Sequence, residues 1–205
     1  VIIMELPGHG SSEAVDKWNA GVSVRNFMFL FNNLDDICDT SLISEIYCHG
    51  HSTGGFVFLR FTRESSKMEY NSLIEGYILE SPLTCYSQIF EESCKLLRVP
   101  KFLKPLFWKR LRFHFNMINP GFEKISDTND VDVPIWGLPD KPTLIVQAAN
   151  DERLGQIHHE RLVESFKKSD RAKLLTNIVL EDLTHAGARN CNSRNDAISN
   201  WLDSN

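Results

Sequence analysis

The chain has 205 residues, 42% of them apolar, which is enough for one domain with its own core. Its 22 basic and 27 acidic residues give a net charge of −5, which argues against a dedicated nucleic-acid-binding protein. No apolar run approaches the roughly 18 to 20 residues that span a bilayer, and Glu5 interrupts the apolar start where a signal peptide would continue, so we expect a soluble protein without a transmembrane segment.

Short apolar runs rich in β-branched or aromatic residues recur along the chain and are typical of buried strands. They occupy residues 1–6, 43–48, 74–79, 143–147 and, less markedly, 177–180. Apolar spacing predicts helices between them, at residues 22–37, 53–63, 157–167 and 196–202. The alternation predicts an α/β fold whose mostly parallel sheet is covered by helices on both faces.

Residues 82–142 interrupt this alternation, because they are too many for a simple crossover and have helical and aromatic content of their own. We expect residues 1–81 and 143–205 to form the core and residues 82–142 to form a helical cap. Between Lys95 and His114 the cap has seven basic residues and no acidic one. A solvated helical face is the simplest interpretation. The alternative is a cap that attracts an anionic substrate or makes weak contact with lipid headgroups at a membrane surface.

A serine between glycines follows the second predicted strand and precedes a predicted helix. The residues Gly50-His51-Ser52-Thr53-Gly54 fit the pattern Gly-x-Ser-x-Gly, in which a tight strand-to-helix turn holds the serine above the sheet. The glycines let strand and helix approach without a Cβ clash. The helix directs free N–H groups at the serine, and the N–H of Thr53 is the expected oxyanion donor. A glycine-rich turn with an incidental serine is the alternative.

A serine nucleophile needs a histidine base and a carboxylate that orients the base. Asp151 follows the strand at 143–147, and His185 follows the strand at 177–180, so both are expected at the edge of the sheet where Ser52 lies. We therefore predict Ser52, Asp151 and His185 as a catalytic triad. Glu80, directly after the strand at 74–79, and Asp182 are alternative acids.

The other six histidines are weaker candidates for the base. His158 and His159 open a helix and are expected to face solvent, His114 lies in the cap, and His9 lies in a turn. His49 and His51 flank the serine turn, where they are expected to support packing or hydrogen bonding.

The chain resembles the α/β-hydrolase superfamily, and within it the serine-aminopeptidase and monoglyceride-lipase types. The matching segments are Glu5 with Pro7-Gly8-His9-Gly10-Ser11-Ser12, the serine turn at 50–55, Glu80-Ser81-Pro82, residues 142–151 and Thr184-His185. The resemblance implies an eight-stranded sheet, a cap inserted after the strand that follows the nucleophile strand, and hydrolysis of esters, amides or related bonds.

The sequence departs from this family at its N-terminus. The resemblance places residues 1–6 in the fourth strand, so the three strands before it are absent, as is the loop that supplies a second oxyanion N–H. Two explanations are open. Either the chain is the C-terminal portion of a longer protein, which the missing Met favours, or residues 1–6 pair directly with residues 43–48 in a reduced sheet. His9-Gly10 is expected to form a structural turn.

Together these features predict a serine hydrolase that cleaves a small-molecule carboxylic ester through an acyl-enzyme, without metal or organic cofactor. A non-catalytic binding module of the same fold and a peptidase or amidase acting on short peptides are the alternatives. The five cysteines are odd in number and include no Cys-x-x-Cys pair, so we expect reduced thiols in a cytoplasmic protein and neither a disulfide framework nor a zinc site.

Overall fold

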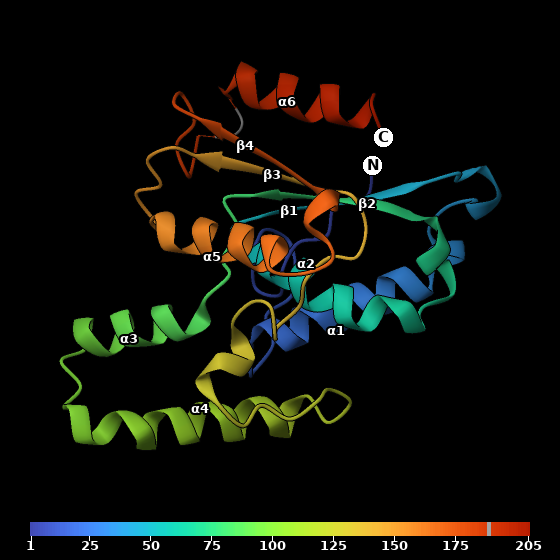
Figure 1. Ribbon diagram of the computed structural model, residues 1–205. Helices are drawn as coiled ribbons and strands as arrows, with labels where there is room; N and C mark the ends of the chain where they lie inside the picture. The colour runs from blue at the N-terminus through green and yellow to red at the C-terminus, as the bar shows by residue number, and fades with distance from the viewer. Residues whose placement is uncertain (188–189) are drawn as a thin grey trace.

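The structure is a computed structural model that describes residues 1–187 and 190–205. Within these residues, four parallel strands form one sheet in the order β1-β2-β3-β4 (Figure 1). The strands are β1 (Ile46–His51), β2 (Ile74–Glu80), β3 (Thr143–Ala148) and β4 (Leu175–Leu180). The predicted α/β class is confirmed.

Six α-helices accompany the sheet in the described part of the chain. They are α1 (Ala20–Asn32), α2 (Thr53–Glu64), α3 (Tyr86–Leu96), α4 (Lys104–Ile118), α5 (Gln156–Lys167) and α6 (Asn192–Leu202). Figure 1 shows α1, α2 and α5 below the sheet, α3 and α4 further from it, and α6 alone on the opposite face. None of these helices is long and apolar enough to cross a bilayer.

Alternation along the strands explains the two layers of core. Leu79 and Ile145 pack against α2 and α5, whereas Ile78 and Leu144 face the other way and pack with Trp201 of α6. All four aliphatic side chains are at most 2% exposed. Apart from the exposed Glu75, the two central strands therefore bury both faces, as their mainly apolar composition predicts. The five cysteines are all free thiols.

The strand predicted at residues 1–6 is not formed, and this prediction is wrong. Val1 and Ile3 are largely exposed, and a groove of about 760 Å³, floored by α1 and α2, separates residues 1–6 from β1. A strand exists only where its N–H and C=O groups meet those of a neighbour. The proposed direct pairing of residues 1–6 with the nucleophile strand is therefore wrong as well.

The predicted cap segment contains α3 and α4, but its final part returns to the core. Val133 and Trp136 are each 1% exposed and pack with Phe56 of α2. The Trp136 ring stacks on the Phe56 ring at 4.5 Å, and its Nε1–H donates to the Phe56 carbonyl over 2.8 Å. This contact ties the segment to the helix that begins at Ser52.

Candidate active site

Ser52 occupies the turn between β1 and α2, where its backbone takes φ 52° and ψ −115°. This left-handed φ is uncommon for a residue with a side chain and indicates local strain. The turn depends on its glycines, because a Cβ at Gly50 would lie 2.7 Å from the backbone of Gly54, and one at Gly55 would lie 2.7 Å from the Cβ of Pro82.

Backbone hydrogen bonds on both sides of Ser52 stabilise the strained turn. Its N–H donates to the carbonyl of Glu80 over 2.9 Å. Its carbonyl accepts from the N–H of Phe56 over 3.2 Å and from that of Leu83 over 3.1 Å. The main chain is thus held by β2 and by the segment that follows β2, while the side chain stays free to project above the sheet.

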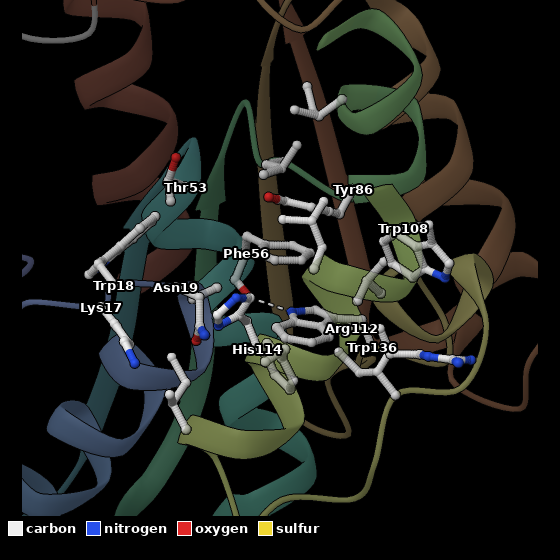
Figure 2. A pocket seen from close by; sticks show the side chains of 18 of the residues that line it. Lys17, Trp18, Asn19, Thr53, Phe56, Tyr86, Trp108, Arg112, His114 and Trp136 are labelled. Carbon is white, nitrogen blue, oxygen red and sulfur yellow. Dashed lines mark hydrogen bonds between the residues drawn. The ribbon is translucent and has the colours of Figure 1, made fainter. Parts of the chain in front are cut away.

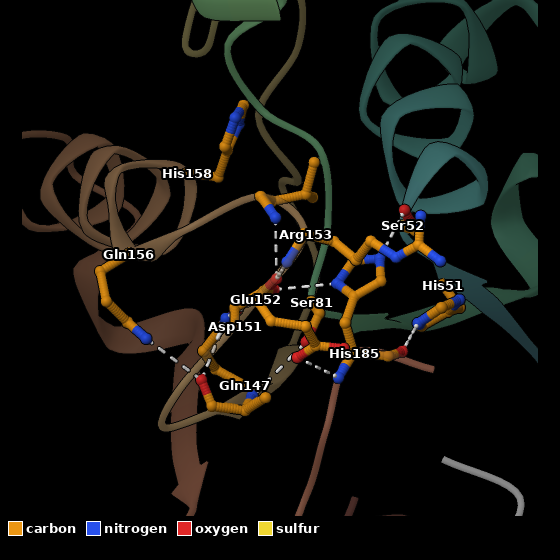
Figure 3. A network of polar contacts seen from close by, with 12 residues as sticks. His51, Ser52, Ser81, Gln147, Asp151, Glu152, Arg153, Gln156, His158 and His185 are labelled. Atoms are coloured by element: carbon orange, nitrogen blue, oxygen red, sulfur yellow. Dashed lines mark hydrogen bonds and ion pairs between the residues drawn. The ribbon is translucent and has the colours of Figure 1, made fainter. Parts of the chain in front are cut away.

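The structure brings Ser52, His185 and Asp151 together (Figure 3). Nε2 of His185 lies 2.9 Å from Oγ of Ser52, and Nδ1 of His185 lies 2.9 Å from Oδ2 of Asp151. Because an ionised carboxylate only accepts, Nδ1–H donates to Asp151, and Nε2 is left to accept from the serine hydroxyl. The three side chains therefore form one directed chain of hydrogen bonds.

Asp151 is held in its ionised form by the loop after β3. Its Oδ1 accepts from the N–H groups of Arg153 over 3.0 Å and Leu154 over 2.8 Å, and its Oδ2 accepts from Nε2 of Gln147 over 3.2 Å. Burial raises the pKa of Asp151, but the hydrogen bonds from Leu154, His185 and Arg153 outweigh it and hold the pKa below its ordinary value. The carboxylate faces the imidazole as an anion near neutral pH.

Two side chains hold the main chain of His185. Nε2 of His51 donates to the His185 carbonyl over 2.7 Å, and a Glu152 carboxylate oxygen accepts from the His185 N–H over 3.3 Å. The His51 and His185 rings lie 4.9 Å apart. Burial lowers the pKa of His51 and so favours its neutral form. The roles of Glu152 and of the Arg153 and Leu154 amides were not anticipated, because they depend on how the loop folds back.

The alternative acids lie elsewhere. Glu80 is 2% exposed and binds Arg194, with Oε2 2.7 Å from the guanidinium Nε, and His49. Burial raises its pKa, but the bonds from Arg194 and His49 outweigh it and lower the pKa to about 2. Asp182 accepts from Ser193. Neither carboxylate is hydrogen-bonded to His185.

His158 is buried, at 2% exposed, so the prediction that it faces solvent is wrong. Its Nδ1 accepts from the N–H groups of Thr84 and Cys85, each over 3.1 Å. His158, Leu162 and Phe166 stand four residues apart on one face of α5, a spacing that could have revealed the burial. The neighbouring His159 is half-buried, 2.8 Å from Oδ1 of Asn177.

Thr53 is the first residue of α2, and its N–H therefore has no acceptor within the helix. Ser52 directly precedes it, so the positive end of the helix dipole lies beside the serine. Thr53 also borders the pocket described next. An oxyanion formed at Ser52 would meet a free N–H at this helix end.

A pocket of about 680 Å³ opens beside Ser52 and Thr53. Figure 2 shows Trp18 and Asn19 on one side of it, with Trp108 and Arg112 of α4 on the other. Its walls are mainly apolar and aromatic and include Phe56, Leu83, Tyr86, Ile89, Trp108, Leu111, Phe115, Ile118, Ile125, Val131, Trp136 and Leu154. The contribution of residues 16–20 to this pocket was not apparent in the sequence.

No family model and no curated protein matches the sequence, but solved structures with a similar fold are known. The chain resembles alpha/beta hydrolase domain-containing protein 10 from mouse, at 14% identity over 96% of this chain and 75% of that one, with a TM-score of 0.60. It also resembles a thermophilic esterase from Thermogutta terrifontis, at 17% identity over 98% and 78% and a TM-score of 0.55. A hydrolase from Pseudomonas aeruginosa PA01 matches at 14% identity over 96% and 77%, with a TM-score of 0.52.

The chain has the α/β-hydrolase fold. In this fold the nucleophile, acid and base follow one another along the chain, each after a strand. Here Ser52 follows β1, Asp151 follows β3 and His185 follows β4. The three hydrogen-bonded side chains thus lie at the edge of the sheet where the α/β-hydrolase fold carries its site.

Proposed function

We propose that this protein is a serine hydrolase that cleaves carboxylic esters, with Ser52 as nucleophile, His185 as general base and Asp151 as the carboxylate that orients the base. The observation that carries the proposal is the chain of two 2.9 Å contacts from Ser52 Oγ through the His185 ring to Asp151 Oδ2. The proposal is supported by the similar structures, which include an esterase and a hydrolase.

In the proposed reaction, Oγ of Ser52 attacks the ester carbonyl carbon while Nε2 of His185 takes the hydroxyl proton. The carbonyl oxygen becomes an anion that the N–H of Thr53 stabilises. Collapse of the intermediate breaks the ester bond, and the leaving alkoxide takes the proton from Nε2. Water then attacks the acyl-enzyme by the same route and releases a carboxylic acid.

The pocket beside Ser52 favours an apolar acyl or aromatic group. Aromatic rings of Phe56, Trp108 and Trp136 are among its walls. Apolar groups of a substrate gain about 25 cal/mol for each Å² they remove from water. Esters with an acyl chain of several carbons should therefore react faster than acetates.

A fluorophosphonate probe, which labels activated serines, tests the proposed nucleophile. We expect the wild-type chain to be labelled and Ser52→Ala to remain unlabelled, with Ser126→Ala as the control that keeps labelling. A folded wild-type protein that takes no label would refute catalysis and leave a binding module. Faster turnover of aminoacyl amides than of esters would contradict the ester assignment and favour the peptidase.

A further inference from the structure

Helix α4 is apolar on two opposite faces. Trp108 and Phe115 lie on the face that lines the pocket beside Ser52. Leu106, Phe113 and Met117, spaced by seven and four residues, share the other face, where they are 61%, 63% and 46% exposed. A helix with apolar side chains on both faces is expected to have an apolar neighbour on each. Among the described residues, the outer face has none that covers it.

Exposed apolar side chains are concentrated around this helix. Eight of the twenty large apolar side chains that are exposed in the described residues fall within residues 96–117, about a tenth of the chain. Leu111 also lines the pocket, so we call the other seven the cap surface: Leu96, Leu97, Phe102, Leu106, Phe107, Phe113 and Met117. Figure 1 places α4 furthest from the sheet, so its outer side is open to a large flat partner.

Positive charge accompanies the cap surface. Lys109 and Arg110 follow Leu106 by three and four positions and therefore flank the exposed apolar face of α4. Of the seven basic residues between positions 95 and 114, Lys104 pairs with Glu91. Five others form no ion pair among the described residues: Lys95, Arg98, Lys101, Lys109 and Arg110. The remainder of the chain is strongly acidic, with fifteen basic and twenty-seven acidic residues.

We propose that the cap surface docks the protein on an anionic phospholipid bilayer. Leucine, phenylalanine and methionine side chains can insert at the boundary between headgroups and acyl chains, while lysine and arginine remain among the phosphates. A second copy of the chain fits this surface less well, because two copies would bring five unpaired cations each into contact. The docking does not depend on the proposed reaction, although it would place the pocket wall formed by α4 at a source of lipophilic esters.

Vesicle sedimentation tests the docking with the full chain. The probes are vesicles of phosphatidylcholine alone and of phosphatidylcholine with about 30% phosphatidylserine, whose surface attracts basic segments. We expect binding to the anionic vesicles at about 0.05 M salt, and a marked loss of binding at about 0.5 M salt, where charges on the surface are screened. A folded protein that binds neither kind of vesicle, or both equally, would overturn the proposal.

Matched substitutions locate the surface. Leu106→Ser should lower the partition coefficient about ten-fold, because it removes most of the benefit of burying one leucine. Leu42→Ser, at an 82% exposed leucine before β1, should leave it unchanged. Lys109→Gln should lower it about five-fold, whereas Lys173→Gln should not.

Circular dichroism would verify that each variant is folded. Equal effects of the cap and control variants would overturn the proposal. The proposal would also be overturned if sedimentation velocity without vesicles showed a dimer of the wild-type chain and a monomer of Leu106→Ser. Labelling of Ser52 by fluorophosphonate does not need vesicles, so failure of the docking and failure of the proposed reaction are separable.

Discussion

Replacement of Glu80 with glutamine tests the buried ion-pair cluster beside the serine turn. The pKa of this carboxyl is about 2 in the fold against an ordinary 4.5. At about 1.4 kcal/mol for each pKa unit, the difference corresponds to about 3 kcal/mol of folding free energy. Burial opposes the low pKa, and the bonds from Arg194 and His49 outweigh it. Glu80→Gln should therefore lower the free energy of unfolding at neutral pH by about 3 kcal/mol.

The lowered pKa of Glu80 also determines how this loss of folding free energy depends on pH. Because the pKa in the fold lies below the ordinary value, the stabilisation is complete above pH 4.5 and disappears as the pH falls toward 2. The stability difference between wild type and Glu80→Gln should shrink by about 1.4 kcal/mol for each pH unit below 4.5. The pKa of Asp151 is also lowered, but this group titrates in both proteins and cancels from the difference.

Urea unfolding followed by tryptophan fluorescence, from about pH 7 to about pH 3, measures these free energies. Glu123→Gln is the matched control, because Glu123 also binds an arginine, Arg63, but its side chain is 69% exposed. Such surface pairs contribute about 1 kcal/mol or less. Equal losses in the two variants at neutral pH, or a Glu80→Gln difference that does not change with pH, would refute the reasoning.

Three further substitutions test the site and its support. Asp151→Asn should lower kcat for ester hydrolysis about ten-thousand-fold, because its oxygen would stay on the Arg153 and Leu154 amides and its NH2 would donate to Nδ1, which holds the base in the wrong tautomer. Asp182→Asn should leave kcat unchanged. His51→Phe should lower kcat about ten-fold with little change in KM, because it removes the donor to the His185 carbonyl but keeps a ring against the imidazole. An unchanged kcat would show that the position of His185 does not depend on the hydrogen bond from His51. Gly137→Ala should lower the free energy of unfolding by about 2 kcal/mol, because its Cβ would overlap a backbone carbonyl of α2, and urea unfolding measures the loss.

Much of the fold could be predicted because its central strands carry a strong local signal. The apolar runs before Glu80 and Ala149 are buried on both faces, so their composition alone distinguishes them. The serine turn is recognisable because strand, turn and helix are contiguous in the sequence. Candidate acid and base residues follow from the same rule, since each comes directly after a strand.

The errors occurred where structure depends on distant partners. Residues 1–6 have the composition of a strand, but no neighbouring strand lies within hydrogen-bonding distance among the described residues. His158 is buried because two amides from the segment after β2 donate to its ring. The pocket wall contributed by residues 16–20 also comes from tertiary packing. Local composition contains none of this information.

The site joins residues that are far apart in the chain, since Ser52 and His185 are separated by 133 positions. Their spacing depends on three parallel strand interfaces in series. A slip of one residue at any of these interfaces would move an attached loop by about 3.3 Å and turn alternate side chains to the other face. The hydrogen bonds that join Ser52, His185 and Asp151 therefore form only when β1, β2, β3 and β4 are paired in the correct register. During refolding, the proposed esterase activity should return with the last of these three strand pairings, after most helical signal has recovered, so it would serve as a kinetic marker for them.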